Sequence, residues 1–189
     1  MRVVAGRFRG RRLSAPEGLA VRPTADRTRE ALFNILTQGR IAQSGPALAG
    51  SHVLDAFAGS GALGIEALSR GAAHVSFIES HASAIAALRR NLAMLGTESS
   101  CSVFTADALH PPAPPSAAGP CTLVLMDPPY NQGLAVPALH ALARSGWLAP
   151  EALIAVELMR GEAFEAPEGY TTLDDRHYGK AQLVFLRRS

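Results

Sequence analysis

A tetrapeptide in the second half of the chain, Asp127-Pro128-Pro129-Tyr130, combines residue types that could hold a planar amine. It follows an apolar run over residues 122–126 that is typical of a buried strand. The two prolines fix φ and remove two N–H donors, so we expect a rigid loop with its carbonyls pointing outward. The Asp127 carboxylate and these carbonyls could accept hydrogen bonds from an –NH2 group, and the Tyr130 ring could stack on a base. We therefore predict a catalytic site at these four residues, against the alternative of a proline-rich turn in which Tyr130 only packs.

A glycine-rich segment, Asp55-Ala-Phe-Ala-Gly59-Ser-Gly61-Ala-Leu-Gly64, ends in the pattern Gly-x-Gly-x-x-Gly between an expected strand and an expected helix. Small residues there let the backbone approach a ligand closely at a helix N-terminus. A simple tight turn would give the same glycine pattern, so the glycines alone do not identify the ligand. The position of Asp55 is more specific. It lies four residues before the first glycine, where nicotinamide sites usually continue with small or apolar residues. The form Asp-x-x-x-Gly-x-Gly is typical of S-adenosylmethionine (SAM) sites.

Two further carboxylates follow the next two expected strands. Glu79 closes the second strand, where it could accept both ribose hydroxyls, and Asp107 lies just past the third, where it could meet the adenine amino group. A single acid at a strand end is more often solvated, but three of them at one sheet edge favour a ligand site. We predict cofactor contacts from Asp55, Phe57, Ala58, Gly59, Ser60, Gly61, Gly64, Glu79, Ser80, Asp107 and Ala108.

Positive charge is concentrated at the N-terminus. The first 30 residues hold eight Arg and three acidic residues, whereas the whole chain has a formal net charge of only +2. Arginine suits bidentate phosphate contacts and stacking on bases, and Gly6, Gly10 and Pro16 suit an extended arm. A merely solvated charged face is the alternative. We predict an anionic partner, a nucleic acid, contacted by Arg2, Arg7, Arg9, Arg11, Arg12, Arg22, Thr24, Arg27 and Arg29.

The elements that must position these residues follow an alternating pattern. Apolar runs predict strands over His52–Phe57, His74–Glu79, Ser100–Ala106, Thr122–Asp127 and Ala152–Leu158, and an antiparallel pair over Tyr170–Arg176 and Ala181–Arg187. Helices are predicted over Ala25–Gln38 with Thr24 as N-cap, Ala62–Ser69, His81–Leu95 and Leu134–Ser145. A short hairpin is expected from Arg2–Ala5 and Arg12–Ala15, and a linker over Gln43–Gly50. Continuously apolar strands alternating with helices favour an α/β fold, a doubly wound parallel sheet covered on both faces.

Length and composition narrow the class of protein. The 189 residues favour one domain with a short appendage, which we divide into a basic arm, residues 1–24, and a body, residues 25–189. No apolar run reaches the length of a membrane span, and the charged N-terminus is unlike a signal peptide. The two cysteines fit reduced thiols, and the six scattered histidines show no metal-binding spacing. We expect a cytoplasmic protein with no metal.

Together these motifs resemble the RsmD family, bacterial 16S rRNA (guanine-N2)-methyltransferases. The most specific part is Arg22-Pro-Thr-Ala-Asp-Arg-Thr-Arg-Glu30-Ala-Leu-Phe-Asn34, since the glycine turn and Asp-Pro-Pro-Tyr occur in many amino-methyltransferases. The N-terminal Arg2-Val-Val-Ala-Gly6 and Arg9-Gly-Arg-Arg-Leu13 also fit, so the resemblance covers essentially the whole chain. The chain departs from the family pattern at Ser80-His81, where relatives often carry another acidic or polar pair.

This resemblance implies a class I SAM-dependent methyltransferase, with a Rossmann-like seven-stranded sheet whose last strand is antiparallel. It also implies SAM as methyl donor, with S-adenosylhomocysteine as the product, and N2 of one guanine of 16S rRNA as acceptor. The rRNA partner could be free, or part of the small ribosomal subunit or of an assembly intermediate, and we expect a monomer with no membrane partner. The residues leave open an adenine or cytosine amine in DNA or other RNA, a glutamine amide in protein, and a non-catalytic RNA-binding assembly factor.

Overall fold

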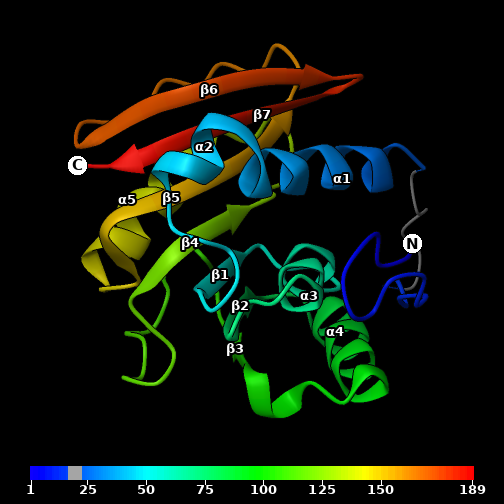
Figure 1. The fold of residues 1–189 in the computed structure, drawn as a ribbon. Helices are drawn as coiled ribbons and strands as arrows, with labels where there is room; N and C mark the ends of the chain where they lie inside the picture. Colours follow the sequence, from blue (N-terminus) through cyan, green and yellow to red (C-terminus); the bar gives the residue numbers. More distant parts are fainter. Residues whose placement is uncertain (17–22) are drawn as a thin grey trace.

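A seven-stranded sheet forms the centre of the computed structural model, which describes residues 1–16 and 23–189 (Figure 1). Its strands are β1 (His52–Ala56), β2 (His74–Glu79), β3 (Cys101–Thr105), β4 (Cys121–Met126), β5 (Leu148–Met159), β6 (Tyr170–Tyr178) and β7 (Ala181–Arg188). The helices are α1 (Pro23–Thr37), α2 (Gly39–Ser44), α3 (Ala62–Ser69), α4 (Ala82–Leu95), α5 (Ala135–Arg144) and the short 3-10 helix η1 (Glu98–Ser100).

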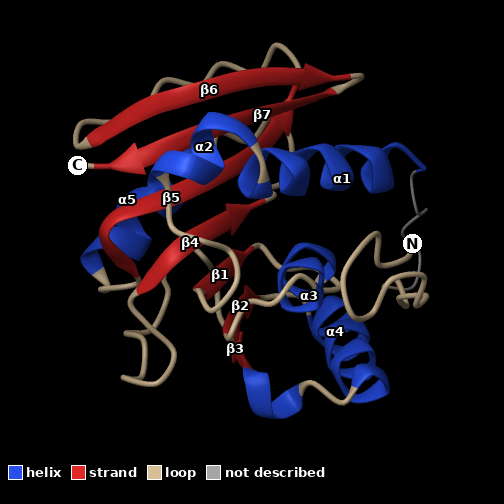
Figure 2. Ribbon diagram, in the orientation of Figure 1, coloured by secondary structure: helices blue, strands red, loops and turns tan. Residues whose placement is uncertain are grey.

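The strand order is β3-β2-β1-β4-β5-β7-β6. Strands β1 to β5 pair in parallel, whereas β7 runs antiparallel to both β5 and β6. Figure 2 shows β6 and β7 as a long hairpin at the edge of the sheet opposite β3. The expected seven-stranded sheet with an antiparallel last strand is therefore confirmed. Strands β2 and β3 are added on one side of β1, and β4 and β5 on the other, so the carboxyl ends of β1 and β4 form the switch point where ligands of such sheets bind.

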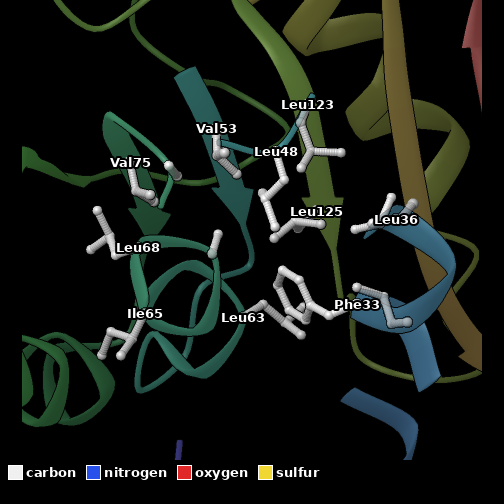
Figure 3. Close-up of a cluster of buried hydrophobic side chains, with 14 of the residues drawn as sticks. Phe33, Leu36, Leu48, Val53, Leu63, Ile65, Leu68, Val75, Leu123 and Leu125 are labelled. Atoms are coloured by element: carbon white, nitrogen blue, oxygen red, sulfur yellow. The ribbon is translucent and has the colours of Figure 1, made fainter. Parts of the chain in front are cut away.

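The sheet separates two hydrophobic clusters, as continuously apolar strands require. One lies beneath α1 to α4, and Figure 3 shows Phe33 and Leu36 of α1 approaching Leu63 of α3 and Leu125 of β4. The other packs α5 against the opposite face, with the fully buried Trp147 among its members. Alternate residues along a strand belong to different clusters: in β4, Leu123 and Leu125 belong to the first and Val124 and Met126 to the second. Both faces of the sheet are therefore covered.

The N-terminal arm packs directly on the body. Val3 and Leu13 are both buried in the cluster shared with α1 to α4. The backbone N–H groups of Val4 and Ala5 donate to the Glu66 carboxylate of α3, at 2.8 and 3.0 Å. Figure 1 shows this blue segment beside α3 and α4. The division at residue 24 therefore stays a prediction about function, since residues 1–16 share the core of the body.

Several expected boundaries need correction. Helix α1 begins at Pro23, a favourable first helical position, so Thr24 lies inside the helix and is not its N-cap. Helix α2 was not expected, and its last two residues fall in the expected linker Gln43–Gly50. Strand β5 starts at Leu148, four residues before the expected Ala152. The expected hairpin of the arm is present in short form, as one antiparallel bridge between Arg2 and Arg12 with backbone hydrogen bonds on either side of it.

Across residues 1–16 and 23–189, we find no helix that is both long and apolar enough to cross a membrane.

Candidate functional site

The turn between β1 and α3 has an unusual backbone. Phe57 has a φ of 64°, which costs a non-glycine residue free energy and is typical of functional sites. Gly61 and Gly64 are required by packing, because a Cβ would lie 2.3 Å from a side-chain carbon of Leu88 or Phe77, respectively. A Cβ on Gly59 would meet nothing within 4 Å, although its φ of 56° favours glycine. The turn therefore brings α3 close to the sheet and leaves the backbone at Gly59 open.

Asp55, at the end of β1, is buried with an unsatisfied acceptor. Its Oδ2 accepts the N–H of Gly64 at 2.8 Å, and its Oδ1 has no hydrogen-bond partner among the described residues. Burial raises the pKa of Asp55 to about 8, the Gly64 N–H opposes this rise, and the charge of Glu79 adds to it. A buried carboxyl group of this kind gains most from a positively charged donor.

Glu79 connects the turns that follow β1 and β2. Its Oε2 accepts the N–H of Gly59 at 2.7 Å, and its Oε1 accepts the N–H groups of Ser80 and His81 at 2.8 and 2.7 Å. These three bonds fix the carboxylate at the sheet edge. Each carboxylate oxygen can accept more than one hydrogen bond, so Glu79 keeps capacity for a further donor.

The two cofactor contacts predicted after β3, Asp107 and Ala108, differ in burial. The Asp107 side chain is 48% exposed; its Oδ1 accepts the N–H of Leu109 at 2.9 Å, and its Oδ2 lies 3.5 Å from Nδ1 of His110. Ala108 is buried in the cluster that contains α5. Asp107 is therefore available at the surface of this edge, while Ala108 packs in the core.

A cavity of about 210 Å³ joins the glycine turn to the Asp-Pro-Pro-Tyr loop. It lies at the carboxyl ends of β1 and β4, which pair in parallel. Besides Asp55 and Asp127, it is lined by Met1, Pro16, Arg29, Phe57, Ala58, Gly59, Ser60, Ala62, Leu63 and Glu157. The structure thus brings together two sequence motifs that are more than 60 residues apart.

The Asp127–Tyr130 loop leaves the sheet directly after β4. Asp127 is exposed and lines the cavity, whereas Pro128 is buried and Pro129 is exposed. The Tyr130 hydroxyl donates to Oε1 of Glu157 at 2.7 Å, which fixes the ring relative to β5. Tyr130 is therefore held by a specific polar contact and is not merely packed.

The comparisons with known proteins identify the family. The family model described as "Conserved hypothetical protein 95" matches residues 1–187. Ribosomal RNA small subunit methyltransferase D of Escherichia coli (strain K12) is 41% identical over 157 residues, which cover 83% of this chain and 74% of that protein. The chain belongs to the RsmD family, which this model describes. The methyltransferase D relative from Haemophilus influenzae is 37% identical over 180 residues, covering 95% of this chain and 89% of its own.

Solved structures of other proteins agree with this family assignment. The yhhF protein of Escherichia coli superimposes with a TM-score of 0.80 at 34% identity, covering 100% of this chain and 98% of its own. The magnesium protoporphyrin IX methyltransferase of Synechocystis, solved with bound SAM, superimposes with a TM-score of 0.63 at 17% identity, covering 88% of this chain and 80% of its own. The expected class I methyltransferase fold is confirmed.

The sequence analysis missed Glu157, which lines the same cavity as Asp55 and Asp127. Burial raises its pKa, and this rise is opposed by the hydrogen bond from Tyr130 and by the charge of Arg29. The signal available in the sequence was a lone acid inside the otherwise apolar run Ala152–Leu158, since burying an unpaired charge is costly. That signal alone does not say which cavity the acid lines.

Arg29 was predicted to contact nucleic acid, and the structure corrects this. Its side chain is only 3% exposed, one guanidinium nitrogen donates to the Arg2 carbonyl and to Asp26 at 2.6 and 2.8 Å, and Nε lies 3.7 Å from Glu66. A guanidinium buried in this way cannot reach a phosphate on the surface. Arg29 instead joins the arm to α1 and lines the cavity.

The other predicted nucleic-acid contacts are at the surface wherever their side chains are described. The Arg22 position and the Thr24 side chain lie outside the described residues. The guanidinium carbon of Arg7 lies 4.5 Å from the centre of the Phe8 ring. The exposed members of the predicted set are Arg2, Arg7, Arg9, Arg11, Arg12 and Arg27.

Proposed function

We propose that this protein transfers a methyl group from SAM to the exocyclic N2 of one guanine in 16S rRNA. The observation that carries the proposal is the cavity that joins the buried Asp55 Oδ1 to Asp127. The printed names of the Escherichia coli and Haemophilus influenzae relatives, which are ribosomal RNA methyltransferases of the small subunit, support the substrate class.

The residues around the glycine turn fit SAM. Asp55 Oδ1 is a buried acceptor suited to the ammonium group of the methionine part, and Arg29 is a cation suited to its carboxylate. Gly59 allows close approach to the backbone, Glu79 suits the ribose hydroxyls, and Asp107 suits the adenine amino group. SAM supplies an activated methyl group on a sulfonium centre.

The chain's task at the acceptor is to orient a weak nucleophile. The lone pair of guanine N2 is delocalised into the ring, so the free amine reacts slowly. Hydrogen bonds from the –NH2 group to the Asp127 carboxylate and the Pro128 carbonyl would direct that lone pair toward the methyl group, and the Tyr130 ring would support the base. Catalysis then rests on positioning and on the negative charge of Asp127 beside the nitrogen. The proton released from nitrogen passes to Asp127 or to water.

The arm suits the RNA partner of this reaction. Six exposed arginines from the arm and α1 give a positively charged surface on the molecule that also carries the cavity. We propose that the arm contacts 16S rRNA, either free or within the small subunit. We also propose that the protein acts as a monomer in the cytoplasm.

Methyl transfer from tritium-labelled SAM tests this function. Purified protein is incubated in parallel with 16S rRNA, small ribosomal subunits, DNA and protein, and labelled nucleosides are identified after digestion. We expect N2-methylguanosine from 16S rRNA or the small subunit, with no label in DNA or protein. Labelled N6-methyladenosine, labelled DNA, or an absence of transfer to every acceptor would contradict the proposal.

A further inference from the structure

The acceptor side of the cavity holds a second carboxylate beside Asp127. In the parallel pairing of β4 and β5, Met126 is opposite Val156; the next residue of each segment is Asp127, directly after β4, and Glu157, still within β5. Both line the cavity. A carboxylate costs free energy when it is withdrawn from water within an apolar strand, so Glu157 requires partners that compensate this cost.

One oxygen of Glu157 already has a protein partner. Its Oε1 accepts the Tyr130 hydroxyl at 2.7 Å, and within the described residues its Oε2 accepts no hydrogen bond. The Asp-Pro-Pro-Tyr loop therefore fixes the Glu157 carboxylate and leaves it one oxygen for a ligand. Any group that lies between Asp127 and Glu157 meets two hydrogen-bond acceptors and must supply donors to both.

The Watson–Crick edges of the purines differ in this respect. In guanine the exocyclic amine lies next to the N1–H group, so the edge presents adjacent donors. In adenine the amine lies next to N1, which is an acceptor. An adenine amine held by Asp127 would turn the N1 lone pair toward a second carboxylate, which leaves a buried acceptor without a donor. Two acceptors in a row thus match guanine and reject adenine.

We propose that Glu157 accepts the N1–H of the target guanine and is the residue that selects guanine over adenine. The proposal rests on the proposed function, because it assigns N2 of a guanine to Asp127. Tyr130 then has two tasks in the site, since its ring supports the base and its hydroxyl orients the carboxylate that recognises the base edge.

Glu157→Gln tests the proposal with little change in shape. The amide oxygen can still accept the Tyr130 hydroxyl, but the amide –NH2 then replaces Oε2 and opposes N1–H with a donor. The substrates are full-length 16S rRNAs assembled by ligation, with guanine or 2-aminopurine at the methylated position found by nucleoside mapping. 2-Aminopurine keeps the amine but has a lone pair at N1.

For the wild-type protein we expect kcat/KM to favour guanine over 2-aminopurine by roughly a hundredfold or more. In Glu157→Gln this preference should fall by a factor of about ten or more, because the amide can donate to N1 of 2-aminopurine. The dissociation constant for SAM should stay within about threefold of wild type, which shows that the variant is folded. A preference that is unchanged in Glu157→Gln, or absent in the wild type, would overturn the proposal.

Tyr130→Phe is the matched control, because it keeps the ring and removes only the hydroxyl that holds Glu157. If Glu157 acts only by orienting Tyr130, Tyr130→Phe should lose activity, whereas Glu157→Gln should keep both its activity and its base preference because the amide oxygen still accepts the hydroxyl; the proposal then fails. If Glu157 contacts the base, Tyr130→Phe should keep the preference for guanine. Failure of the proposed function itself is distinct, since wild-type protein would then form a nucleoside other than N2-methylguanosine.

Discussion

At the scale of single residues, Asp127 and Asp55 differ in burial although both line one cavity. Asp127 is exposed at the end of β4, whereas Asp55 is buried at the end of β1 with one oxygen unsatisfied. The exposed carboxylate can receive an incoming amine, and the buried one can only be satisfied by a ligand that enters the cavity. Two separate measurements follow, one on turnover and one on SAM binding.

Asp127→Ala removes the acceptor that we assign to the target amine. Because this interaction is needed chiefly in the transition state, turnover should fall by roughly a hundredfold or more, which is about 2.7 kcal/mol. Single-turnover kinetics with saturating RNA measure the change. The dissociation constant for SAM, measured by calorimetry, should stay near the wild-type value. Turnover close to wild type would refute the assignment of Asp127.

SAM binding should depend on pH through Asp55. Burial raises the pKa of this carboxyl to about 8, so below pH 8 it is largely protonated in the free protein and must lose a proton to pair with a cation. The dissociation constant for SAM should therefore rise as pH falls from 7.5 to 6, by at most about tenfold per unit. Asp55→Asn should bind more weakly and without this slope. Equal slopes in the two proteins would show that Asp55 does not pair with SAM.

At the scale of elements, Glu79 links the turn after β1 to the start of α4. Its carboxylate accepts three backbone N–H groups, from Gly59, Ser80 and His81. The loop that approaches the ligand is thus fixed by the same side chain that we assign to the ribose. Substitution of Glu79 should affect SAM binding both through the lost contact and through a looser turn.

Glu79→Ala should raise the dissociation constant for SAM about ten- to hundredfold, as expected for a charge-assisted contact of about 1.5–3 kcal/mol. Glu79→Gln separates the two causes, because its amide oxygen can still accept backbone N–H groups. Calorimetry measures binding, and thermal unfolding without SAM reports on the turn. Unchanged SAM binding by a correctly folded Glu79→Ala protein would show that Glu79 has been misassigned.

The sequence predicted the positions of strands and turns better than it predicted which side chains meet at the cavity. Apolar runs located the strands, and the glycine pattern located the turn, because both depend on local chemistry. The start of β5 was missed because Pro150 and Glu151 interrupt the pattern, and Glu151 has a φ of 58°. The roles of Arg29 and Glu157 could not be predicted, since they depend on the packing of α1 and β5 around one cavity.

At the scale of the whole molecule, the arm and the cavity are parts of one packed unit. Val3 and Leu13 are buried in the core, and Met1 and Pro16 line the cavity itself. A truncation of the arm would therefore remove core and cavity residues together with charge, and its effects on RNA and SAM binding could not be separated. Substitution of exposed arginines alone leaves the packing intact.

Replacement of Arg7, Arg9, Arg11 and Arg12 by Gln tests whether the arm binds RNA, because all four side chains are exposed. If each contacts one phosphate, the log–log slope of RNA affinity against salt concentration should become shallower by about 3, at roughly 0.7–0.9 per contact. Filter binding at several salt concentrations measures the slope. SAM binding should be unchanged, since Val3, Leu13 and the cavity are kept. Gln at the exposed Arg40 and Arg160, outside the arm, is the control and should leave the slope near wild type. A fourfold variant with the wild-type slope would mean that these arginines only carry solvated charge, and RNA contact would then have to be sought on another face of the molecule.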